Sequence, residues 1–127
     1  MAKSIIYDKA YAFALRIVKL HKYLCEEKKM FLLARQVLRS GTSIGANVAE
    51  ALASQTRKEF ISKIFISLKE ARETAYWLNL LFDSGYMEES HFQSIHTDCQ
   101  ELIKMLSSTA LTTRQKDELT GRKPHHD

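Results

Sequence analysis

The stretch that decides the fold is residues 56–85, which read TRKEFISKIFISLKEARETAYWLNLLFDSG. Thr56 is followed three residues later by Glu59, the capping-box pattern that begins a helix. Apolar residues then recur every three or four positions as far as Phe82, and Gly85 stands where a helix C-terminus is expected. This spacing predicts one long helix whose only strong breaker comes at its end.

The same periodicity predicts a helix on each side of short connections. These helices run from about Ser4 to Glu27, from about Met30 to Ala53, and from about Glu88 to residue 111. Pro124 is the only proline and there are only four glycines, whereas a sheet protein of this size needs more turn residues. We therefore predict an all-α protein: an antiparallel up-down-up-down four-helix bundle over residues 1–111, followed by a flexible polar tail over 112–127.

Composition limits the class of protein further. The chain has 127 residues, 45% of them hydrophobic and 27% charged, which suits one folded domain and excludes wholesale disorder. No uncharged run approaches the roughly 20 residues that cross a bilayer, and the N-terminus does not resemble a signal peptide. Two cysteines, Cys25 and Cys99, are too few for a disulfide framework. We expect a cytoplasmic protein with reduced thiols and no membrane partner.

The helix over residues 56–85 is apolar on more than one face. Beyond its inward stripe it carries large apolar side chains that one bundle would leave uncovered, and a helix apolar nearly all round is buried nearly all round. We therefore predict a homo-oligomer whose interface includes Phe60, Tyr76, Trp77 and Leu81.

The second helix has two distinctive stripes. Small residues recur every four positions at Gly41, Gly45, Ala49 and Ala53, which predicts close approach of another helix rather than a phosphate loop, since no lysine and no strand accompany the glycines. The polar stripe, with its partner on the third helix, predicts an interhelical network of Arg39, Ser43, Asn47, Glu50 and Glu70. We expect Arg39 opposite Glu70, and Glu50 near Lys58 or Lys63.

Residues 36–50, QVLRSGTSIGANVAE, followed by Lys58-Glu59-Phe60, resemble a family of small bacterial four-helix-bundle proteins encoded within intervening sequences of 23S ribosomal RNA genes. The steps Ser67-Leu-Lys-Glu70 and Gly85-Tyr86 match the same pattern. The resemblance implies a homopentamer shaped like a short barrel. It also implies kinship with the accessory protein of diversity-generating retroelements, which uses a basic surface to work with a reverse transcriptase and nucleic acid. Two positions depart from the pattern: Ala51 replaces a glycine and Ser54 an arginine.

Charge placement suggests where nucleic acid would bind. Residues 1–30 carry seven Lys/Arg against three Asp/Glu, whereas residues 87–111 carry one against four. The candidate contacts are Lys19, Lys22, Lys28 and Lys29, with Arg57 and Lys58 at the start of the third helix. Such contacts would bind RNA or DNA mainly through phosphate, with steep salt dependence. The alternative is a protein-interaction scaffold, marked by an exposed apolar patch at Tyr7, Tyr11 or Tyr23.

The sequence contains few residues in patterns that indicate catalysis or metal binding. His91, His96 and Cys99 cluster early in the fourth helix, but a zinc site normally needs four ligands, and Cys99 suits a core position. His125 and His126 form an isolated pair. Bundle metal sites use two Glu-x-x-His motifs, whereas only Glu88-Glu-Ser-His91 has that spacing here. We expect no catalytic residue, no cofactor and no metal site; an enzyme acting between subunits would require a pocket with convergent titratable groups.

Overall fold

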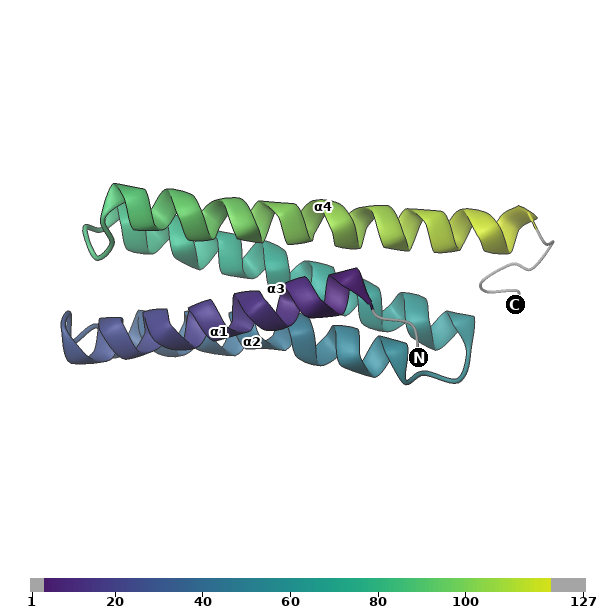
Figure 1. Ribbon diagram of the computed structural model, residues 1–127, viewed down its shortest axis with the longest axis horizontal. Helices are drawn as coiled ribbons and strands as arrows, with labels where there is room; N and C mark the ends of the chain where they lie inside the picture. The colour runs from purple at the N-terminus through teal and green to yellow at the C-terminus, as the bar shows by residue number, and fades with distance from the viewer. Residues whose placement is uncertain (1–3, 120–127) are drawn as a thin grey trace.

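The computed structural model describes residues 4–119, apart from the side chains of residues 117 and 118, and is all-helical over that range (Figure 1). Its four helices are α1 (Ile5–Glu26), α2 (Phe31–Leu52), α3 (Arg57–Asp83) and α4 (Glu89–Leu119). The α1–α2 and α3–α4 turns lie at one end of the elongated molecule, and the α2–α3 turn lies at the other (Figure 1). The predicted helix number and class are confirmed.

Local signals place the helix ends. The Ser4 hydroxyl accepts a hydrogen bond from the Tyr7 N–H at 3.0 Å, which caps α1. At α3 the Thr56 Oγ1 accepts from the Glu59 N–H at 3.1 Å, and the Glu59 carboxylate accepts from the Gln55 N–H at 3.0 Å. The capping box thus begins α3 as predicted, with its return bond one residue earlier than the standard pattern.

Gly85 ends α3 because it takes a backbone conformation that other residues adopt at a cost. Its φ is +87°, in the left-handed region. The Tyr86 N–H donates to the Leu81 carbonyl at 2.9 Å and the Gly85 N–H to the Phe82 carbonyl at 3.0 Å. This pair of bonds is the Schellman C-cap, so the predicted stop at Gly85 is confirmed.

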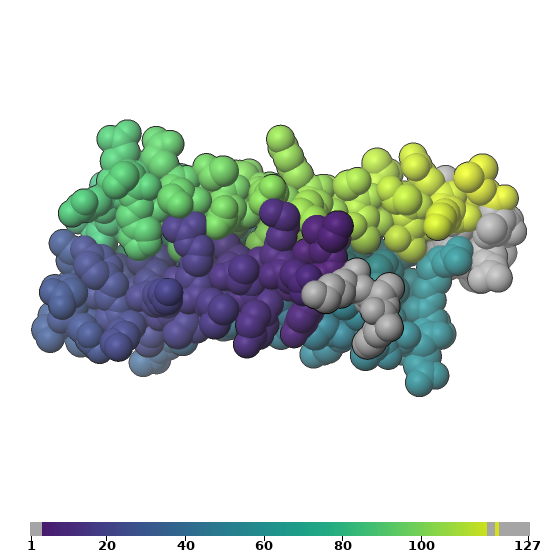
Figure 2. All heavy atoms as spheres, viewed as in Figure 1, coloured from purple at the N-terminus to yellow at the C-terminus, as the bar shows by residue number. Residues whose placement is uncertain are grey.

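The four helices enclose one apolar core. α2 packs against α1 and α3, α4 packs against α3, and α1 meets α4 over a smaller surface (Figures 1 and 2). The largest fully buried side chains come from all four helices: Phe13, Ile17, Leu20, Leu24, Val37, Ile44, Ile64, Leu78, Leu81, Ile95, Leu102 and Leu106. Leu81 is therefore a core residue of the single chain, and its predicted place in an oligomer interface is wrong. At position 81 the helical period of α3 directs the side chain into the core of its own chain, so this residue is not part of the apolar surplus on the other faces of the helix.

The ridge of small residues on α2, formed by Gly41, Gly45, Ala49 and Ala53, packs against α1 over only half its length. A Cβ on Gly41 would lie 2.7 Å from Ile17 Cγ1, so α1 packs against bare backbone there. Gly45 is also buried, but a Cβ there would meet Ala10 at an ordinary 3.5 Å. Ala49 and Ala53 are exposed. The close approach predicted for the whole ridge is thus confined to its N-terminal half.

The C-terminal boundary differs from the sequence prediction. α4 continues to Leu119, so residues 112–119 are helical rather than part of a flexible tail. The segment contains good helix formers, the Thr113 hydroxyl donates to the Thr109 carbonyl at 2.8 Å, and the Arg114 guanidinium lies 4.8 Å from the Phe65 ring centroid. The rest of the predicted tail, 120–127, falls outside the described residues. Over the described range, no helix has the length and apolarity to span a membrane.

Candidate nucleic-acid interface

The six cations predicted to contact nucleic acid lie at opposite ends of the molecule. Lys28 and Lys29 occupy the α1–α2 turn, with Lys19 and Lys22 on the last turns of α1. Arg57 and Lys58 begin α3 at the other end (Figure 1). The 22 residues of α2 separate the two groups by about 33 Å at 1.5 Å per residue. One chain therefore presents two basic clusters and does not bring the six side chains into one site.

The cluster at the α1–α2 turn is surrounded by carboxylates. The exposed acidic residues at this end are Glu26, Glu27, Asp83, Glu88 and Glu89. Lys28 Nζ lies 5.9 Å from the Tyr23 ring centroid, and Lys29 has a φ of +54°, a conformation that is costly for a non-glycine residue. The excess of positive charge seen along residues 1–30 is therefore offset in space by the acidic α3–α4 turn.

The cluster at the α2–α3 turn includes cations from a second helix. An open groove of about 390 Å³ runs between this turn and the last turns of α4, and Arg57, Phe60 and Lys116 are among its lining residues. Arg114 lies nearby, over Phe65. Sequence reasoning omitted Arg114 and Lys116 because it assigned residues 112–127 to a tail.

The predicted ion pairs between α2 and α3 are present. Arg39 Nη1 lies 3.4 Å from Glu70 Oε1, and Arg39 also pairs with Glu73. Farther along, Lys63 Nζ lies 2.7 Å from Glu50 Oε1. Both predicted partners, Glu70 for Arg39 and Lys63 for Glu50, are confirmed, and Glu73 is an addition.

Ser43 and Asn47 do not join this interhelical network. The Ser43 hydroxyl donates to the Arg39 carbonyl at 2.6 Å, and the Asn47 amide donates to the Ser43 carbonyl at 2.8 Å. Both bonds stay within α2, because short polar side chains reach the carbonyl one turn earlier more easily than a neighbouring helix. The prediction that these two residues bridge helices is corrected.

Three buried polar residues bond across α2 and α3 instead. Ser40, Ser67 and Thr74 are fully buried. The Ser67 hydroxyl donates to the Ile44 carbonyl at 2.8 Å, and the Thr74 hydroxyl lies 2.9 Å from that of Ser40. Sequence reasoning missed them, although their place within the apolar stripes of two facing helices was an available signal. The Thr74 hydroxyl also bonds to the Glu70 carbonyl at 2.8 Å, within α3. The two interhelical contacts favour the observed register, because a shifted register would separate both pairs.

An aromatic pair continues the Arg39 network along α3. Trp77 Nε1 donates to Glu73 Oε2 at 2.9 Å, and the Tyr76 ring meets the Trp77 ring edge-on with centroids 5.0 Å apart. Trp77 and Phe60 are half-buried and pack against the core of their own chain, whereas Tyr76 is 58% exposed. Of the four predicted interface residues, Tyr76 is therefore the most accessible.

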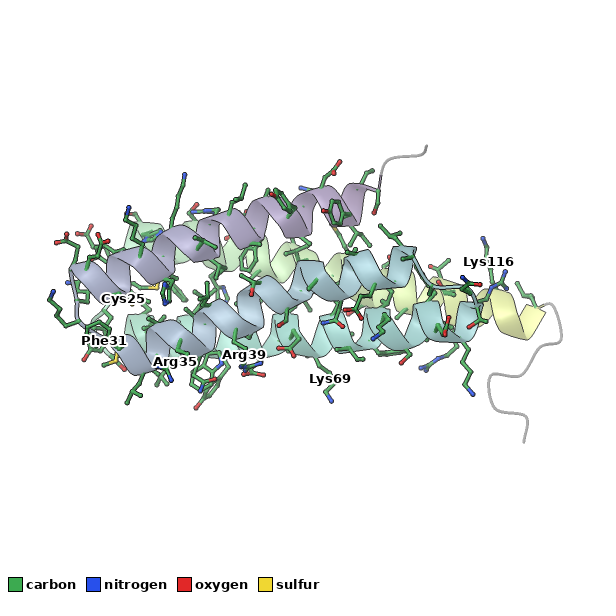
Figure 3. All side chains as sticks on the ribbon, turned by 90° about the horizontal axis from the view of Figure 1, so that it is seen from below. Cys25, Phe31, Arg35, Arg39, Lys69 and Lys116 are labelled. Atoms are coloured by element: carbon green, nitrogen blue, oxygen red, sulfur yellow. The ribbon has the colours of Figure 1, made fainter. Side chains whose placement is uncertain are left out.

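Unpaired cations surround this aromatic pair. Figure 3 shows Arg35, Arg39 and Lys69 along one long edge of the molecule, formed by α2 and α3. Arg35, Lys69 and Arg72 are exposed and form no side-chain hydrogen bond or ion pair with any residue that the structure describes. Sequence reasoning missed all three, although the spacing of residues 69, 72 and 76 on one helix face was a usable signal.

Cys99 and His91, which the sequence offered for metal binding, are wholly or partly buried in the bundle. Burial, with a smaller contribution from the Asp98 carboxylate, raises the pKa of the Cys99 thiol to about 12, and the thiol contacts the Ala71 carbonyl at 3.3 Å. Burial and the nearby Arg16 lower the pKa of His91 against an opposing effect of Glu88. Within residues 4–119, no group of three metal-ligating side chains comes together. His125 and His126 fall outside the described residues.

An exposed apolar stripe lies on α1. Tyr11 is 55% exposed, Leu15 52% and Val18 49%, and their spacing places them on one face of the helix. Tyr7 and Tyr23, the other candidates for an exposed patch, are half-buried against the core.

Comparisons with known proteins decide the family. Residues 2–108 match the model of the 23S rRNA-intervening sequence protein family. The chain belongs to that family. A crystal structure of a protein with unknown function from the S23 ribosomal protein family of Bacteroides thetaiotaomicron is similar, with 48% identity and a TM-score of 0.83. The match covers 84% of this chain and 98% of that one. No curated protein matches the sequence.

Membership in the 23S rRNA-intervening sequence protein family makes the two departures from its pattern interpretable. Ala51, in place of the glycine, is buried within α2, which continues to Leu52. Ser54, in place of the arginine, donates its hydroxyl to the Ala51 carbonyl at 2.6 Å and helps end the helix. Helix α2 thus continues through Ala51, and the uncharged Ser54 contributes to the end of the helix.

Proposed function

We propose that this protein is a non-enzymatic nucleic-acid-binding accessory protein that acts on RNA phosphates through basic surfaces repeated around a homo-oligomer. The observation that carries the proposal is the α2–α3 edge, where Arg35, Lys69 and Arg72 are exposed and without a partner among the described residues. Unpaired cations bind phosphate at lower cost than cations already held by carboxylates. Binding of this kind is tolerant of sequence and weakens steeply with salt, and DNA would bind by the same contacts.

A non-enzymatic role is supported by the occupation of the carboxylates nearest the α2–α3 turn. A groove of about 410 Å³ contains Glu50, Glu59 and Lys63. Glu50 pairs with Lys63, and Glu59 caps the backbone before α3.

The proposed assembly is a ring of up-down-up-down bundles, with five copies as the family resemblance implies, working in the cytoplasm. The exposed stripe of Tyr11, Leu15 and Val18 on α1 supports contact between copies, because three large apolar side chains in a row on one surface favour association. Repetition of weak phosphate contacts around a ring increases the overall affinity through avidity.

The same α1 stripe favours a second candidate function, a scaffold that binds a partner protein and no nucleic acid. Apolar association is little affected by moderate salt, whereas phosphate binding is strongly weakened. Salt dependence therefore separates the two candidates.

The test is size exclusion with light scattering on the protein mixed with mixed-sequence RNA, at low and at moderate salt. We expect an oligomer that binds RNA at low salt and releases it as salt rises. Arg35→Gln with Arg72→Gln should weaken this binding, whereas Lys28→Gln with Lys29→Gln, which removes the same charge from the end that carries the acidic α3–α4 turn, is the control. An oligomer that ignores RNA at low salt contradicts the proposal and leaves the scaffold. Leu15→Lys then tests whether α1 mediates assembly.

A further inference from the structure

The exposed face of α3 carries an aromatic ring among cations, and we call this surface the Tyr76 face. It consists of Tyr76, Lys69 and Arg72 on α3 together with Arg35 on α2. Lys69 and Arg72 precede Tyr76 by seven and four residues, which places all three on adjoining positions of one helix surface. The rise of an α-helix spreads them over about 10 Å along the axis.

The register between the helices places Arg35 beside this aromatic ring. Residues 50, 44 and 40 of α2 contact residues 63, 67 and 74 of α3, in that order, so partner numbers on α3 rise as numbers on α2 fall. Arg35, one turn before Arg39, therefore lies level with the turn that contains Tyr76 and Trp77. Figure 3 shows Arg35 and Arg39 next to each other on the edge where Lys69 also projects.

Contacts on the Tyr76 face hold the ring in place while leaving it accessible. Glu73 accepts hydrogen bonds from both Trp77 and Arg39, which fixes the indole ring. Tyr76 packs edge-on against that indole and is still 58% exposed. An exposed ring held by its neighbours loses little conformational freedom when a flat ligand stacks on it.

Cations around a fixed, exposed aromatic ring are the features that bind single-stranded nucleic acid. The phosphates are bound by the cations, and an unpaired base stacks on the ring. In a duplex the base faces are already stacked inside the helix and cannot reach such a ring. Glu70 and Glu73 both pair with Arg39, and with Arg35, Lys69 and Arg72 the face keeps a net charge of +2.

We propose that the Tyr76 face binds single-stranded RNA, with a base stacked on Tyr76 and the adjoining backbone phosphates on Arg35, Lys69 and Arg72. This inference rests on the proposed RNA-binding function and narrows it to single-stranded RNA bound at the Tyr76 face. It also gives Tyr76 a role other than the oligomer contact predicted from the apolar character of its helix.

Fluorescence anisotropy tests the proposal with the full chain and a labelled mixed-sequence RNA, presented as a single strand and as a fully paired duplex. Tyr76→Ala should weaken single-strand binding by about five- to one-hundredfold, the effect of losing one base stack. Duplex binding should be unchanged, and Tyr76→Phe should bind as wild type because it keeps the ring.

A matched pair of charge variants tests the phosphate contacts. Arg72→Gln should lower the salt dependence of single-strand binding by roughly one counterion. Lys104→Gln, at an exposed cation on α4 that has no side-chain partner among the described residues, should not change it.

The outcomes separate this inference from the proposed function. If wild-type protein binds neither RNA, the proposed function fails and the inference fails with it. If RNA binds and Tyr76→Ala is indistinguishable from wild type, the inference is overturned and the proposed function stands. Light scattering on Tyr76→Ala completes the test: an unchanged mass with weakened single-strand binding supports the proposal, and a reduced mass assigns Tyr76 to an interface between copies and overturns it.

Discussion

α1 is held by its two neighbours in different ways. Against α2, Ile17 lies on the bare backbone of Gly41 and is completely buried. Against α4, which it meets over a smaller surface, two ion pairs lie at the edge of the shared core: Arg16 Nη1 lies 2.7 Å from Asp98 Oδ2, and Lys9 Nζ lies 3.0 Å from Glu101 Oε1. The four charged side chains are between 34% and 52% exposed.

This difference indicates where the stability of the bundle comes from. Burying an apolar side chain removes it from water and fills space, whereas an exposed ion pair gains little because water already solvates both charges. We therefore expect α1 and α2 to form the tighter pair, with the two ion pairs adding little to the smaller contact between α1 and α4. Substitutions at adjacent residues of α1 can test this contrast.

Ile17→Ala should have the largest effect, a loss of about 2–5 kcal/mol in the free energy of unfolding, because it leaves a cavity against Gly41. Urea unfolding followed by circular dichroism measures it. Val18→Ala, at the neighbouring position on the exposed stripe, is the control and should change the stability of a free chain by under about 0.5 kcal/mol. Equal losses at the two positions would contradict the assignment of Ile17 to the tight contact.

Gly41→Leu should destabilise by about 1–3 kcal/mol, because a side chain must displace Ile17 or separate the two helices. The same unfolding measurement applies. Gly45→Ala, where the added Cβ meets Ala10 at ordinary contact distance, should be neutral or stabilising by up to about 1 kcal/mol through helix propensity. If Gly41→Leu were tolerated as well as Gly45→Ala, the close approach would not hold in solution.

Arg16→Ala should cost no more than about 1 kcal/mol, and the difference from wild type should shrink as salt is added. The variant loses the ion pair with Asp98 and a hydrogen bond to the Ser94 hydroxyl at 3.1 Å. Unfolding curves at two salt concentrations give the result. A salt-independent loss as large as that of Ile17→Ala would mean that the α1–α4 contact is as important as the α1–α2 contact.

At neutral pH the inner side of α4 provides the smallest effect, because the contribution of the Cys99 thiol appears only at high pH. The folded chain holds the Cys99 pKa near 12, above the ordinary value of 9.0. Between these two values the unfolded thiol loses its proton while the folded thiol keeps it, so stability should fall as the pH rises from about 9 towards 12. Unfolding measured across this range should show a weaker decline for Cys99→Ala. An identical decline in both proteins would rule out Cys99 as its source.

Much of the fold follows from local signals. Thr56 with Glu59, and Gly85 with its left-handed backbone, define the ends of α3 without help from the rest of the chain. The Arg39–Glu70 pair was predictable because two helices joined by a short turn place residues at equal distances from that turn side by side. By contrast, residues 112–119 lack clear apolar periodicity, and Arg114 is anchored by Phe65 from a distant part of the sequence.

The candidate site was harder to predict from the sequence than the fold. Charge counted along the chain suggested a basic end near Lys28 and Lys29, but carboxylates more than fifty residues away, Glu88 and Glu89, lie at that end of the bundle. Arg35 and Tyr76 are likewise distant in sequence and are placed together by the register of α2 against α3. The local charge of a segment does not predict the charge of a surface built from several segments.

The sequence by itself determined the helices, their number and most of their ends, because hydrophobic period and capping act within a few residues. It also determined which positions are apolar and which are charged. Only the tertiary structure decided that Leu81 is core, that α1 exposes an apolar stripe, and that the candidate cations divide between two ends. The physical reason is that burial and net surface charge depend on neighbours from other helices, and their positions are fixed only when the helices pack.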